Sequence, residues 1–135
     1  MPRVFRVMRE DHDGLPLVAP SANGLGVRPG VDIDLDESGN VIVKGMSVNP
    51  DWRNAPLFRI PERLRHIRPG ARGPNVNACF RYGDGQFERG HFAQGLTLQP
   101  DAATHGTIAP VSSVHLSEYE AALAATRSGW EKWED

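Results

Sequence analysis

Three short segments of this chain each place one chemically useful polar side chain among apolar neighbours. They are residues 4–8 (Val-Phe-Arg-Val-Met), residues 45–48 (Gly-Met-Ser-Val) and residues 104–110 (Thr-His-Gly-Thr-Ile-Ala-Pro). Their apolar residues are typical of β-strands, and polar groups on the strands of a split sheet often furnish a cleft. The sequence therefore predicts a cleft that contains a guanidinium, a hydroxyl and an imidazole, from Arg6, Ser47 and His105.

Each of the first two side chains also has an ordinary interpretation. Arg6 lies in a segment fit for a core strand, so it needs a partner or a ligand unless it points outward. As a ligand group, its guanidinium suits a phosphate or a ribose edge, because it forms planar, bidentate hydrogen bonds. Ser47 could be a plain turn hydroxyl.

Other patterns that could do chemistry are weaker. Cys79, the single cysteine, could act as a nucleophile beside His91 or His105, but free cysteine is among the most buried residue types. The five histidines show no ligand spacing, which disfavours a metal site. The sequence contains no phosphate loop, dinucleotide fingerprint, zinc-protease motif or nucleophile elbow.

Composition limits the class of protein. With 135 residues and 39% hydrophobic content, the chain predicts one compact domain over residues 1–135. A formal net charge of −2 argues against gripping nucleic acid by global electrostatics. The single cysteine suits a reduced cytoplasm, and we expect no signal peptide and no membrane span.

The elements that must position these groups begin with strands. We expect a strand over residues 3–8, an ordered coil or a short helical turn over residues 16–30, and a hairpin of residues 31–35 and 41–43 around a turn at residues 36–40. The aspartates of the hairpin should face water. Its second strand leads into residues 45–47, so Ser47 should sit at or just past a strand end.

The second half predicts a strand at or near a sheet centre over residues 76–82, a short strand within residues 87–98 and a last strand over residues 105–111. A closing helix is predicted to begin with Ser117 as N-cap and Glu120 as its capping-box partner. Its core-packing stripe comprises Tyr119, Leu123, Thr126, Trp130 and Trp133.

In this order, and followed by the closing helix, the three segments resemble the ADP-ribosyltransferase-like toxin domain of the type VI secretion exported effector family. Residues 104–110, read as Thr-His-x-Thr-Ile-x-Pro, carry the most particular match. The resemblance spans most of the chain, from Arg3 to the final helix. It implies an α+β, ADP-ribosyltransferase-like fold of split antiparallel β-sheets with short helices and a C-terminal helix.

The resemblance also implies a bacterial toxin, used in competition between bacteria, that takes NAD as its substrate and needs no metal. Arg6, Ser47 and His105 would be catalytic, and Arg6, Gly45 and Ser47 would bind NAD. Arg6 would hold the pyrophosphate, Ser47 would orient the nicotinamide ribose, and His105 would contact the ribose or position an acceptor. The implied partners are an acceptor molecule in the cytoplasm of a target cell, a cognate immunity protein that blocks the cleft, and a secretion carrier.

The sequence departs from this family at one place. Many transferases of the fold use a carboxylate on a third strand, where this chain has Ala109. Either His105 substitutes, or an acid comes from elsewhere, or the domain binds NAD without turning it over. Asp84, Glu88 and Asp101 are the nearest acids in the sequence.

An arginine-rich passage over residues 53–72 offers an alternative function. It could form a solvated, salt-bridged face, a phosphate-binding rim, or a surface for RNA or DNA in a non-catalytic NAD- or nucleic-acid-binding module. A brief helix is predicted within it, beginning at Pro61 and ending before residues 69–70 (Pro-Gly). Only Trp52 and Phe58 could stack on bases, which disfavours a single-strand platform.

Overall fold

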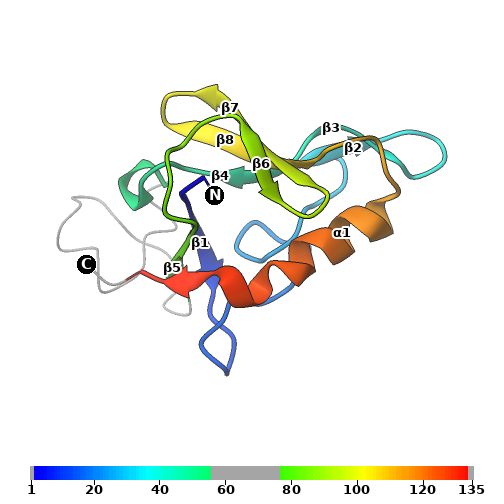
Figure 1. Cartoon of the computed structure of the whole chain (residues 1–135). Helices are drawn as coiled ribbons and strands as arrows, with labels where there is room; N and C mark the ends of the chain where they lie inside the picture. Colours follow the sequence, from blue (N-terminus) through cyan, green and yellow to red (C-terminus); the bar gives the residue numbers. More distant parts are fainter. Residues whose placement is uncertain (1, 56–76, 134–135) are drawn as a thin grey trace.

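The computed structural model describes residues 2–55 and 77–133, which form an α+β fold dominated by antiparallel sheets (Figure 1). One α-helix, α1 (Leu116–Ala125), lies near the C-terminal end. The predicted helix around residues 61–68 and all of the arginine-rich passage beyond residue 55 lie outside the described residues. Among the described residues, no helix is long and apolar enough to cross a membrane.

A three-stranded sheet has the order β1 (Val4–Arg9), β5 (Asn77–Tyr82), β9 (Glu131–Lys132). The predicted strands over residues 3–8 and 76–82 are thus confirmed, and the second is central. Alternate residues of β1 enter two apolar clusters, which explains why the whole strand is buried up to its last residue. Val4 and Met8 join the main core, whereas Phe5 and Val7 pack with Cys79 in a smaller cluster.

A four-stranded sheet has the order β4 (Met46–Val48), β8 (His105–Pro110), β7 (Leu96–Ala102), β6 (Gly90–Ala93). Its core face is apolar and carries Met46, Val48, Leu96, Leu98 and Ile108. Ser47 pairs with Thr107 on the opposite, half-buried face. Ser47 therefore lies in the middle of a strand, not at a strand end as the sequence predicted.

The remaining hairpin joins β2 (Ile33–Leu35) to β3 (Val41–Lys44), as the alternating pattern predicted. The expectation that its aspartates face water is wrong for Asp32, whose side chain is only 16% exposed and pairs with Arg28. After β3 the chain bends at Lys44, which adopts a φ of 68°, and Gly45 leads directly into β4.

The closing helix differs from its prediction at both ends. His115, not Ser117, is the N-cap, and its ring accepts a hydrogen bond from the Ser117 N–H. The helix ends at Ala125, so Trp130 and Trp133 lie beyond it and beyond the 3₁₀ turn Arg127–Gly129. Trp130 is still buried, against Tyr82 and Phe92, because this turn folds it back onto the main core.

Ion pairs tie the last turn to the first loop. Arg127 contacts Asp13 at 2.7 Å and Asp11 at 3.3 Å, and Lys132 contacts Glu10 at 2.6 Å. The loop that follows β1 and the segment that follows α1 are thereby held together across the sequence.

A candidate ligand cleft between β1 and β4

An isolated bridge joins the two sheets, between Phe5 of β1 and Asn49 just after β4. Their backbones exchange two hydrogen bonds, of 2.7 and 2.9 Å. The same antiparallel register would next pair Val7 with Ser47, but that pair is not formed, so the strands diverge there. The two sheets therefore separate between β1 and β4.

A cavity of about 170 Å³ opens beside this split. Among the described residues, its lining comes from four separate parts of the chain: Arg6, Val7, Ser47, Asn49, Asn54, Ala55 and His105. The structure thus brings together all three polar residues that the sequence singled out. Gly45, predicted to bind NAD, does not belong to this lining.

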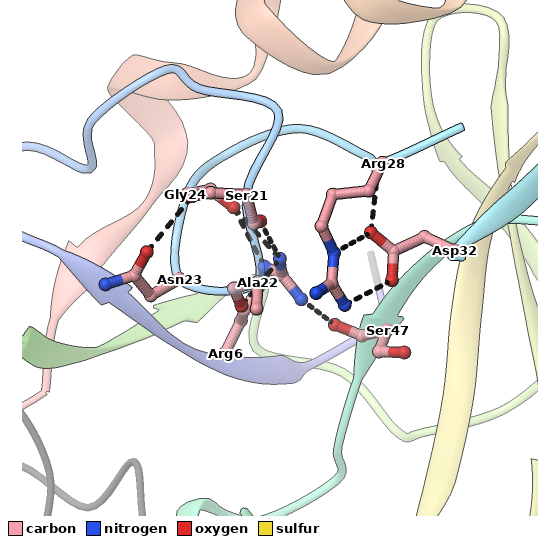
Figure 2. Close-up of polar contacts among 8 residues, drawn as sticks. All are labelled: Arg6, Ser21, Ala22, Asn23, Gly24, Arg28, Asp32 and Ser47. Carbon is pink, nitrogen blue, oxygen red and sulfur yellow. Dashed lines mark hydrogen bonds and ion pairs between the residues drawn. The ribbon is translucent and has the colours of Figure 1, made fainter. Parts of the chain in front are cut away.

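Arg6 is 7% exposed, and backbone carbonyl oxygens surround its guanidinium (Figure 2). Nη1 donates to the Ser47 carbonyl at 2.7 Å, while Nε and Nη2 donate to Gly24 at 3.2 and 3.0 Å. Nη2 also donates to Ala22 at 3.3 Å. β1 and β4 diverge at Ser47, so the Ser47 carbonyl has no backbone partner on β1, and Arg6 donates to it instead. Arg6 also binds the loop at residues 21–24 and so links this loop to both strands.

An ion pair between Arg28 and Asp32 lies beside Arg6, and the sequence did not predict it. Arg28 grips Asp32 with two side-chain hydrogen bonds of 3.1 Å, and its backbone N–H adds a third of 2.8 Å (Figure 2). Burial opposes ionisation of Asp32, but these hydrogen bonds and the nearby charge of Arg6 keep the pKa of its carboxyl below the usual value. The sequence signal for this pair is the four-residue spacing of Arg28 and Asp32 around the Pro-Gly turn at residues 29–30.

Ser47 presents its carbonyl to Arg6, which leaves its hydroxyl for the half-buried face of the sheet. Within residues 2–55 and 77–133, this hydroxyl makes no hydrogen bond to another group. This hydroxyl suits a ligand, because a bound molecule need not displace an existing partner.

Gly45 and Tyr119 fix the strand that carries Ser47. A Cβ on Gly45 would collide with the Ile108 carbonyl oxygen, so only glycine allows this close approach of the two backbones. The buried Tyr119 hydroxyl accepts from the Met46 N–H at 3.0 Å and donates to the Ile108 carbonyl. Burial raises the pKa of Tyr119, which keeps the hydroxyl protonated and able to donate.

His105 stands at the rim of the cleft with Asp101. Its Nδ1 lies 2.7 Å from an Asp101 carboxylate oxygen, and the side chains are 37% and 60% exposed respectively. A β-bulge between Pro100 and Ala102 supplies the extra residue that sets Asp101 beside the ring. Asn49 holds the adjoining turn by donating from Nδ2 to the Thr104 carbonyl at 2.8 Å.

The other candidate residues lie outside this cleft. Ala109 is 5% exposed and lines a separate hollow of about 160 Å³ with Lys44 and Gln99. Asp84 and Glu88 are exposed and do not line the cleft. Cys79 is fully buried in the smaller apolar cluster, which confirms its interpretation as a packing residue.

Comparisons of the chain with protein-family models, curated proteins and solved structures gave no match.

Proposed function

We propose that this protein is an ADP-ribosyltransferase-like toxin that binds NAD and transfers ADP-ribose to an acceptor in the cytoplasm of a target cell. One observation carries the proposal: Arg6, Ser47 and His105, from three separate strands, line the same cavity where two sheets diverge. The resemblance to the effector family rests on these same residues.

The size of the cavity fits part of NAD. Pockets that enclose a drug-sized ligand measure roughly 300–1,000 Å³, and this one measures about 170 Å³. It suits the nicotinamide end with its ribose, while the pyrophosphate and adenosine would lie over the open side. Bound NAD would supply a ribosyl bond whose cleavage develops positive charge on the ribose.

The residues around the cavity divide into two groups. Ser47 offers a hydroxyl to hydrogen-bond the ribose or the carboxamide, and Arg6 stabilises β4 by donating to the Ser47 carbonyl. At the rim, Asp101 provides a carboxylate through its contact with His105, a negative charge near a developing cation. The acid that the third strand lacks at Ala109 thus comes from the preceding strand, β7.

NAD binding tests the proposal directly. Titration calorimetry of NAD into the wild-type protein should give saturable binding that Ser47→Ala weakens about tenfold, the loss of roughly one hydrogen bond. Ser112→Ala is the matched control, because Ser112 is an exposed serine that lines the separate hollow. Absence of NAD binding by the folded wild type would refute the proposal, and equal affinities of the two variants would remove Ser47 from the site.

Toxicity tests the cellular half of the proposal. Induced expression of the wild type in a bacterium should slow growth and lower NAD, whereas Ser47→Ala at equal soluble level should do so less. The cognate immunity protein would relieve toxicity by covering the cleft. Equal growth with wild type, Ser47→Ala and an empty vector would contradict a toxin.

A further inference from the structure

The pair formed by Asp101 and His105 has a geometry that the resemblance does not account for. The bulge in β7 sets two residues, Asp101 and Ala102, opposite His105, and the Asp101 carboxylate contacts Nδ1 at 2.7 Å. Asn49, itself anchored to Phe5, fixes the turn between them. The Asp101 carboxylate thus orients the imidazole, while the Asn49 contacts hold the backbone of the turn that precedes His105.

This orientation determines which ring nitrogen can react. A carboxylate accepts from Nδ1–H, and a neutral imidazole protonated at Nδ1 keeps its lone pair on Nε2. Within the part of the chain that the structure describes, Nε2 makes no hydrogen bond. A base whose second nitrogen is fixed by a carboxylate is the arrangement that removes a proton from a nucleophile.

The position of His105 and Asp101 relative to Ser47 suits a site where Ser47 binds the ribose and His105 meets the acceptor. Ser47 pairs with Thr107, so His105 is its diagonal neighbour across β4 and β8. Diagonal neighbours lie about 7–8 Å apart, which leaves room for a reacting group between them. Both residues are half-buried, and the His105 side chain is 37% exposed and reaches solvent, the side from which a second molecule arrives.

We propose that His105, positioned by Asp101, is the general base that activates a hydroxyl acceptor, water or an alcohol, for ADP-ribose transfer. The inference rests on the proposed function. The bond between the ribose C1′ and the nicotinamide nitrogen breaks, and its electron pair leaves with neutral nicotinamide. The acceptor oxygen forms the new bond to C1′, and its proton passes to Nε2 of His105. A hydroxyl needs such a base, because it is a weak nucleophile until it loses its proton.

Two small acceptors distinguish the chemical class. The full-length protein is incubated with NAD and either methanol, as an oxygen nucleophile, or agmatine, as a guanidino nucleophile, and the products are identified by mass spectrometry. Free ADP-ribose and its methyl glycoside are expected, and no agmatine adduct. An agmatine adduct as the main product would overturn the proposal.

Variants test the pair itself. His105→Gln and Asp101→Asn should lower kcat about 100-fold with the KM for NAD within threefold of the wild type, and Asp101→Glu should restore part of the loss. His91→Gln, at an exposed histidine of β6, is the matched control and should behave as the wild type. Nicotinamide release at the wild-type rate by both His105→Gln and Asp101→Asn would overturn the proposal.

A readout that does not depend on turnover completes the test. Nitrogen NMR of the His105 ring should show Nδ1 protonated in the wild type and a mixture of tautomers in Asp101→Asn. Identical ring spectra in the two proteins would remove Asp101 as the positioning residue. If the folded wild type binds no NAD by calorimetry, the proposed function itself fails, whereas binding and cleavage that ignore Asp101 and His105 refute only this inference.

Discussion

At the scale of single residues, Arg6 is a buried charge surrounded by backbone carbonyls. Its guanidinium replaces a strand partner for Ser47 and secures the loop at Gly24. Removing it would leave these carbonyls buried without a donor, which costs more than the hydrogen bonds contribute while they are made. Arg6 thus has an architectural task, and any contact with a bound pyrophosphate would come in addition.

Substituting Arg6 with lysine should therefore lower stability. A lysine ammonium cannot reproduce the planar fork that reaches Ser47 and Gly24 together. We expect Arg6→Lys to lose about 3 kcal/mol of unfolding free energy in urea titrations. Arg9→Lys, at the exposed end of the same strand, should change it little. Equal stability of the two variants would show that the carbonyl contacts of Arg6 are dispensable.

Tyr119 gives a second prediction at this scale. Its hydroxyl bridges Met46 and Ile108, so Tyr119→Phe leaves a buried N–H and a buried carbonyl unpaired. The expected loss of unfolding free energy is about 1–3 kcal/mol, measured by chemical denaturation. Tyr82→Phe is the control, because within the described residues the Tyr82 hydroxyl makes no hydrogen bond. A loss no greater than that of the control would contradict the bridge.

At the scale of elements, the kink between β3 and β4 determines where Ser47 lies. Lys44 takes a left-handed backbone conformation, and Gly45 then passes against the backbone of β8. This joint starts a new strand and brings Ser47 opposite Thr107. Gly45 shapes the cleft from outside its lining, in contrast to the ligand contact that the resemblance implies.

Gly45→Ala should disturb this joint. The added methyl group would meet the Ile108 carbonyl, a backbone atom that cannot rotate away, and overpacking of this kind costs about 1–3 kcal/mol. A lower thermal midpoint and weaker NAD binding should appear together. Gly30→Ala is the comparison for backbone strain without a steric clash. Gly30 has a φ of 79°, but nothing lies within 4 Å of an added Cβ. An unchanged midpoint and affinity for Gly45→Ala would contradict the role of the joint.

Local patterns predicted most of these elements, because alternation and turn residues act over a few positions. The strands β1, β5 and β8 and the hairpin of β2 and β3 are examples. The features missed depend on distant partners or local irregularity. The burial of Asp32 needs Arg28, and the carboxylate beside His105 needs a bulge that no alternating pattern signals. His115 displaced Ser117 as N-cap because its ring can also accept a hydrogen bond.

At the scale of the whole molecule, charges join the two ends of the described chain. Arg127 contacts Asp11 and Asp13, and Lys132 contacts Glu10. The hydrogen bond from Arg127 lowers the pKa of Asp13 from 3.8 to about 2. The folded protein therefore binds fewer protons at this carboxyl than the unfolded chain does between these two values.

The pH dependence of stability follows from that difference. Stability contributed by Asp13 is fully present above about pH 4 and is lost as the pH falls through about 2, because protonation ends the contact with Arg127. The thermal midpoint of Asp13→Asn should be lower than that of the wild type at pH 6, and the two should converge near pH 2. Asp84→Asn, at an exposed position, is the control. A gap that persists unchanged at pH 2 would contradict this assignment.

The sheet order β1, β5, β9 also governs when the protein can fold. Its members lie at residues 4–9, 77–82 and 131–132, so the sheet cannot close until residue 132 has been synthesised. Pairings between segments so far apart in sequence slow folding, because a large loop must close before they contribute. Strand β4, which carries Ser47, likewise needs Tyr119, whose hydroxyl accepts the hydrogen bond from the Met46 N–H. A nascent chain that stops short of Tyr119 would therefore have no finished cleft, and whatever activity resides there would begin only after that residue has been added.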